Sequence, residues 1–146
     1  MRAWPWERRP RLAANPGGVH TTNNLHRVYL GKPWAGSAGL MAAAALNAAT
    51  MLTVELLGRI GAAGVLKIEP GDAAKLRLIP PDTLARVKGA TDAAAAIDAA
   101  LRDDRDADAF AIADDLASKA LGWNPRDLAR LRRAQAALRD ARLKPA

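Results

Sequence analysis

A run of hydrogen-bonding side chains lies between Val19 and Leu30, where the sequence reads VHTTNNLHRVYL. Asn, Arg and His side chains carry the donors and acceptors that read base edges, and Thr and Tyr hydroxyls bind phosphates. The polar members of the run are Thr21, Thr22, Asn23, Asn24, His26, Arg27 and Tyr29. Taken alone, their charge and polarity favour the solvated edge of a strand over a nucleic-acid contact.

The elements that would position this run are two short strands and a long helix. Apolar and polar residues alternate at Leu25–Leu30, which predicts a strand over about 25–30. An alanine-rich stretch from Gly36 to Ile60 has apolar residues on several faces and predicts one long, covered helix. Gly64–Glu69 reads as a second short strand, and Pro70 begins a short helix.

The rest of the chain predicts helices. We expect one over Thr91–Leu101 with Thr91 as N-cap, and a second over Asp106–Leu121. Asn124 should cap a third, which has Pro125 in its first turn. The expected fold is α+β and predominantly helical: a small strand pair packed on a long alanine-rich helix, followed by a helical segment. We expect three regions, at residues 1–18 (irregular and basic), 19–80 and 81–146 (a helical tail).

Composition and charge narrow the possible functions. Half of the 146 residues are hydrophobic but few are aromatic, which predicts a thin, alanine-lined core. The net charge of +7 is concentrated in residues 1–34, which hold six Lys/Arg and one acid. A basic surplus favours a polyanion such as nucleic acid, although an ordinary arginine-rich composition would look the same.

No leader sequence or membrane span is expected. The segment after Met1 lacks an apolar core, and the 20 uncharged residues of Ala35–Val54 hold too much Gly, Ala, Asn and Thr for a span, so we expect a buried helix there. The chain has no cysteine, which excludes disulfides and thiolate chemistry and fits a cytoplasmic location.

Catalytic and metal-binding motifs are absent from the sequence. There is no phosphate-binding GxxxxGK[ST] loop and no glycine-rich turn between a strand and a following helix. The two histidines, His20 and His26, have no acidic cluster near them, so no metal site is expected. Asn15-Pro16-Gly17-Gly18 shares only its first two residues with the Asn-Pro-Pro-aromatic motif of amine methylation, and reads as a coincidental loop. We expect no catalytic residue in this chain.

The order of four segments resembles the C-terminal region of adenine-specific DNA methyltransferases of restriction–modification systems. About 60 residues between Val19 and Pro80 carry the likeness, and the most specific piece is the Gly-Val-Leu-Lys-Ile-Glu-Pro run. The segments are VHTTNNLHRVYL, Ala45-Leu46-Asn47, Glu55-Leu56-Leu57-Gly58-Arg59 and Gly64-Val65-Leu66-Lys67-Ile68-Glu69-Pro70. Ala48 stands where that family has serine, and Ala62 and Ala63 replace two glycines of its turn.

The resemblance implies a DNA-recognition role beside a methyltransferase core. The core would bind S-adenosylmethionine and methylate adenine, whereas this chain would hold no cofactor and would bind double-stranded DNA. The expected DNA-binding residues are Thr22, Asn23, Asn24, His26, Arg27, Tyr29, Arg59 and Lys67. Arg59 equally suits a helix C-terminus, and Lys67 a solvated strand. The alternative is a helical structural or protein-interaction module, or a degenerate methyltransferase fragment without DNA binding.

Overall fold

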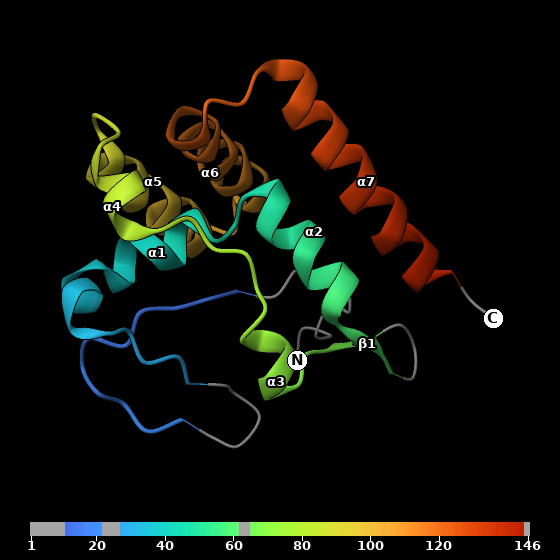
Figure 1. Ribbon diagram of the computed structural model, residues 1–146, viewed down its shortest axis with the longest axis horizontal. Coiled ribbons are helices and arrows are strands. Elements are labelled where there is room, and N and C mark those ends of the chain that lie inside the picture. The colour runs from blue at the N-terminus through green and yellow to red at the C-terminus, as the bar shows by residue number, and fades with distance from the viewer. Residues whose placement is uncertain (1–10, 22–26, 62–64, 145–146) are drawn as a thin grey trace. The chain divides into compact units, whose positions relative to one another are not determined.

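The computed structural model describes residues 11–21, 27–61 and 65–144. Those residues form seven α-helices, one 3-10 helix and a single two-stranded sheet (Figure 1). This confirms the expected α+β, predominantly helical class. The chain divides into two compact units that alternate along the sequence. We call the unit of Met1–Pro10, Ala48–Arg77 and Asn124–Ala146 the hairpin unit, and that of Arg11–Asn47 and Leu78–Trp123 the alanine-core unit.

The long helix expected over Gly36–Ile60 is interrupted. A 3-10 helix at Lys32–Ser37 leads into α1 (Ala38–Ala44), and α2 (Ala48–Leu57) follows after a break. Asn47 is fully buried, and its amide nitrogen donates to the Ala44 carbonyl at 2.7 Å. A side chain that bonds a carbonyl three residues back competes with the helical ladder, and this ends α1. The expectation of one continuous helix was therefore wrong.

The alanine-core unit is built on closely packed helices. Besides α1 it contains α4 (Pro81–Ala85), α5 (Ala90–Arg102) and α6 (Asp106–Leu121), with α1 and α6 both packed on α5. One cluster of its core consists of Ala43, Leu46, Ile97, Ala100, Ala109 and Ala113. Alanines let helix axes approach closely but bury little area each, so the core is thin and alanine-lined, as expected.

Two helix boundaries in this unit show how the caps work. α6 has the predicted bounds and ends at Gly122 (φ 69°), where the Trp123 N–H reaches back to the Ser118 carbonyl at 3.0 Å. The start of α5 differs from expectation. Gly89 (φ 79°) is its N-cap, and Thr91 lies inside the first turn, so the N-cap role predicted for Thr91 was wrong.

The hairpin unit contains α2, the short strands β1 (Arg59–Ile60) and β2 (Leu66–Lys67), α3 (Pro70–Ala73) and α7 (Pro125–Leu143). β2 lies within the predicted second strand, but its partner is β1, which the sequence had placed in the end of the long helix. The Gly61 N–H donates to the Val65 carbonyl at 2.7 Å and closes the pair. Antiparallel strands this near in sequence pair with little loop entropy.

The strand predicted over 25–30 is wrong in the part that the structure describes, because Arg27–Leu30 has no strand conformation. Its alternating pattern did not suffice without a neighbouring edge to pair with. Only the hairpin supplies strand pairing among the described residues.

A buried ion pair joins α7 to α2, and the two helices pack side by side in the hairpin unit (Figure 1). The Arg142 Nε and Nη2 atoms donate to the Glu55 carboxylate at 2.8 and 2.9 Å. The two side chains are only 6% and 4% exposed. Hydrogen bonding to Glu55 raises the pKa of the Arg142 guanidinium against the effect of burial. Since Glu55 lies in the last turn of α2, the pair holds α7 beside the helix that leads into the hairpin.

The N-terminus of α7 matches the sequence prediction. The Asn124 side-chain oxygen accepts the N–H groups of Arg126 and Asp127, and Asp127 accepts the Asn124 N–H. This capping box, with Pro125 in the first turn, fixes where the helix begins.

Within the described ranges, no single helix is long and apolar enough to cross a membrane. Trp34–Ala44 and Ala48–Leu57 meet that criterion only as a pair, and the break at Asn47 lies between them.

Candidate nucleic-acid interface

The hairpin brings together two of the residues singled out from the sequence. Arg59 and Lys67 are direct partners in the β1–β2 register, and cross-strand partners project from the same face of a sheet. Glu69 lies two residues after Lys67. Its Oε1 atom is 2.7 Å from Arg59 Nη2 and 3.2 Å from Lys67 Nζ. One carboxylate therefore holds two cations that are far apart in neither sequence nor space.

The charge balance of this group favours an anion. The hydrogen bond from Arg59, followed by that from Lys67, lowers the pKa of Glu69, so the carboxylate stays ionised at neutral pH. Two cations and one anion leave a local surplus of one positive charge. The side chains of Arg59 and Lys67 remain 71% and 70% exposed, so both can reach a phosphate while Glu69 orients them.

A glycine sets the approach of the hairpin to α2. A Cβ atom at Gly58 would lie 2.5 Å from Leu66 Cδ1 and 2.6 Å from Leu66 Cγ. Only a residue without a side chain lets β2 pack this closely against the end of α2. Gly58 therefore fixes where Arg59 and Lys67 stand.

The other predicted DNA-binding residues lie in the alanine-core unit. Arg27 is exposed, and its Nε atom donates to the Thr21 hydroxyl at 2.7 Å. Tyr29 is 82% exposed. Thr22, Asn23, Asn24 and His26, the remaining predicted contacts, lie outside the described residues.

Comparison with protein families decides the relationship that the sequence suggested. Residues 5–117 match the family model of the C-terminal domain of the type II methyltransferase M.Eco57I. The match spans well over half of the chain. This protein belongs to that family. The resemblance to methyltransferase C-terminal regions is thus confirmed at the level of the family. No curated protein and no solved structure matched the chain.

Within this M.Eco57I C-terminal domain, two residues of the motif-bearing segments have structural roles that the sequence reading missed. Asn47 bonds the end of α1, and Glu55 binds Arg142. Glu55 did carry a signal. It is the first charged residue after the 20 uncharged residues of Ala35–Val54, and a lone acid on a buried helix needs a partner. The identity of the partner, 87 residues away, could not be read from the sequence.

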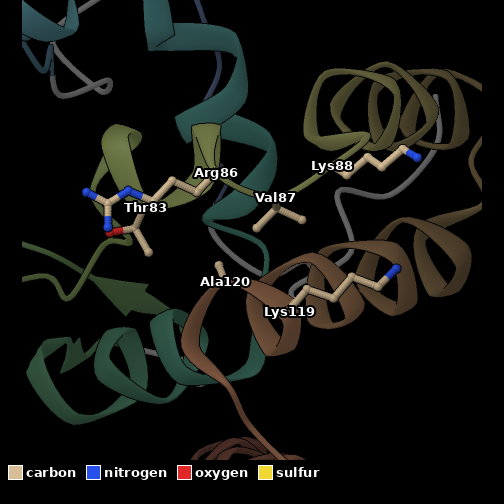
Figure 2. A pocket seen from close by; sticks show the side chains of 6 residues that line it. All are labelled: Thr83, Arg86, Val87, Lys88, Lys119 and Ala120. Atoms are coloured by element: carbon tan, nitrogen blue, oxygen red, sulfur yellow. The ribbon is translucent and has the colours of Figure 1, made fainter.

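An open pocket of about 450 Å³ lies in the alanine-core unit, between the end of α4 and α6. It is lined by Thr83, Arg86, Val87, Lys88, Lys119 and Ala120. Figure 2 shows the Arg86 side chain extending to one side, near Thr83, and Lys88 and Lys119 extending to the other. A small-molecule site needs polar groups that converge on the ligand, and these diverge.

Catalytic chemistry gains no support from the described residues. Among them, no group of three or more His, Asp or Glu side chains could hold a metal ion. The Asn15 side chain is used within its own turn, since it donates to the Val19 carbonyl at 2.8 Å and accepts the Val19 N–H at 2.9 Å. That geometry agrees with the reading of Asn15–Gly18 as a loop.

Proposed function

We propose that this M.Eco57I C-terminal domain binds double-stranded DNA and serves target recognition in an adenine-specific methyltransferase. The observation that carries the proposal is the hairpin, where Arg59 and Lys67 face the same side, exposed and oriented by Glu69. Guanidinium and ammonium groups in this arrangement suit the backbone phosphates of a duplex. Membership of a methyltransferase domain family supports DNA as the polyanion.

The division of labour follows from the motifs. S-adenosylmethionine would bind in the catalytic core, which would flip and methylate adenine in the cytoplasm while this domain holds the duplex. Arg59 and Lys67 would supply phosphate contacts. Thr22, Asn23, Asn24, His26, Arg27 and Tyr29 would supply base or sugar-phosphate contacts from the polar segment of residues 19–30.

The direct test measures binding of the 146-residue chain to labelled duplexes of several sequences over a range of salt concentrations. Affinity should fall steeply with salt, and Lys67→Gln should weaken binding about equally for all sequences while reducing the salt slope by roughly 1. Arg59→Gln should act in the same direction.

Lys75→Gln is the matched control. Lys75 is an exposed lysine of the same unit, paired with Asp72 at 2.9 Å, and its loss changes the net charge equally. The control should bind like the unchanged chain. Absence of DNA binding at low salt, with and without the methyltransferase core, would refute the proposal. Equal affinity for DNA and heparin, insensitive to Arg27→Ala and Lys67→Gln, would favour an interaction module.

A further inference from the structure

The charge of the C-terminal third is divided between the two units. Residues 78–123 hold five Lys/Arg and nine acids, whereas residues 124–144 hold seven Lys/Arg and two acids. Helices α5 and α6 belong to the alanine-core unit, and α7 belongs to the hairpin unit. The near-neutral tail is therefore an acidic pair of helices followed by a strongly basic one.

Some of the α7 charges have structural partners. Arg142 is buried on Glu55, Arg139 contacts Asp140 at 3.0 Å, and Asp127 belongs to the capping box. Arg126, Arg130 and Arg133 differ, because all three are exposed and their guanidinium groups bind no other side chain within the described ranges. We call these three residues the arginine stripe.

The arginine stripe occupies one face of α7. Its members are four and three residues apart, which places them above one another on a helix with about 3.6 residues per turn. Gln135 and Arg142, the buried residues of α7, fall on the opposite side by the same spacing. The stripe therefore points away from the face that packs on α2.

Three like charges at helical spacing disfavour the helix unless a counter-charge compensates them. The stripe spans about 10 Å along the helix axis, at roughly 1.5 Å per residue. A DNA duplex presents one phosphate charge per about 1.7 Å of its axis, so several phosphates lie within this length. The planar fork of arginine binds phosphate oxygens in pairs, which makes the backbone of a duplex the complementary surface.

The fold ties the stripe to the hairpin. The Glu55–Arg142 pair holds α7 on α2, and only Gly58 separates α2 from β1. The segments 48–77 and 124–144 together hold eleven Lys/Arg and five acids, a formal charge of +6. The segments 11–47 and 78–123 hold eight and nine, a formal charge of −1. Helix α7 also lies beyond residues 5–117, which match the family.

We propose that the arginine stripe of α7 is a second phosphate-binding surface, which grips the backbone of the same duplex that the β1–β2 hairpin contacts. This inference rests on the proposed function. It assigns to a helix outside the family match a share of the DNA affinity that is independent of sequence.

The test compares the triple variant Arg126→Gln/Arg130→Gln/Arg133→Gln with a control of equal net charge. The control is Arg102→Gln/Arg105→Gln/Lys119→Gln, which removes three exposed cations of the alanine-core unit that already pair with acids. Glutamine has nearly the helix propensity of arginine, so circular dichroism should show both variants folded. Affinity for duplex DNA is then measured against salt concentration.

The stripe variant should bind more weakly than the unchanged chain, and its log–log salt slope should be smaller by about 3, at roughly 0.9 per lost phosphate contact. The control should keep the slope of the unchanged chain. A stripe variant that behaves like the control, while Lys67→Gln still weakens binding, overturns this inference and leaves the proposed function standing. A chain that binds no DNA at all overturns both.

Discussion

Removing the charge of Glu55 should unfasten α7 from α2. The Glu55 and Arg142 side chains are 4% and 6% exposed and share two hydrogen bonds of 2.8 and 2.9 Å. Glu55→Gln keeps the shape of the side chain but leaves the Arg142 charge buried without its counter-ion. Breaking a buried ion pair in this way costs about 3–5 kcal/mol of unfolding free energy.

The assay is urea unfolding followed by circular dichroism, with amide hydrogen exchange to locate the loss. The expected loss is greatest in α7 and α2, because these helices share the pair. A matched exposed pair provides the control. Asp98 and Arg102 are 2.7 Å apart but largely exposed, so Asp98→Asn should cost only about 0.2–1 kcal/mol.

A second variant separates the buried charge from the packing. Replacing both partners, as Glu55→Leu/Arg142→Met, removes the uncompensated charge and should recover most or all of the stability that Glu55→Gln loses. The reasoning is refuted if Glu55→Gln costs no more than Asp98→Asn. It is also refuted if the double variant is as unstable as Glu55→Gln alone.

Three further predictions concern local features. Gly58→Ala should cost about 1–3 kcal/mol in thermal unfolding, because the new methyl group would overlap Leu66, and Leu66→Ala should restore most of that loss. Since the pKa of Glu69 is lowered, its ion pairs contribute stability above its ordinary pKa of 4.5 and lose it as the pH falls through the lower value of the folded state; an NMR titration should show this, and Arg59→Gln should move the pKa back toward 4.5. Asn124→Ala removes the acceptor of two N–H groups and should cost about 1 kcal/mol, whereas an unchanged urea midpoint would contradict the capping role.

Local signals in the sequence were sufficient where an element depends on its own residues. The bounds of α6 and the capping box of α7 followed from residues at the helix ends, because a cap is satisfied within a few positions of the chain. The alanine-lined core followed in the same way from composition. The start of α5 did not, because Gly89 adopts a left-handed conformation that placed the helix boundary one residue earlier than Thr91 predicted.

Pairing between distant residues was beyond the sequence reading. The alternation at Leu25–Leu30 predicted a strand, yet Arg27–Leu30 found no edge, and β2 paired with Arg59–Ile60 instead. The break at Asn47 depended on a buried side chain bonding a carbonyl, which the helical pattern could not reveal. In the candidate site, the sequence nominated Arg59 and Lys67 separately, but only the hairpin register showed that they face the same side and share Glu69.

Charge shows most clearly what each level determined. The sequence by itself fixed the net charge of +7, the absence of cysteine and the helical, alanine-rich character, and it located the basic surplus in the first 34 residues. Only the tertiary structure brought α7 to the hairpin, through an ion pair between residues 55 and 142. Because charges act through space rather than along the chain, this contact concentrates the positive charge in the hairpin unit and leaves the helices of the alanine-core unit nearly neutral.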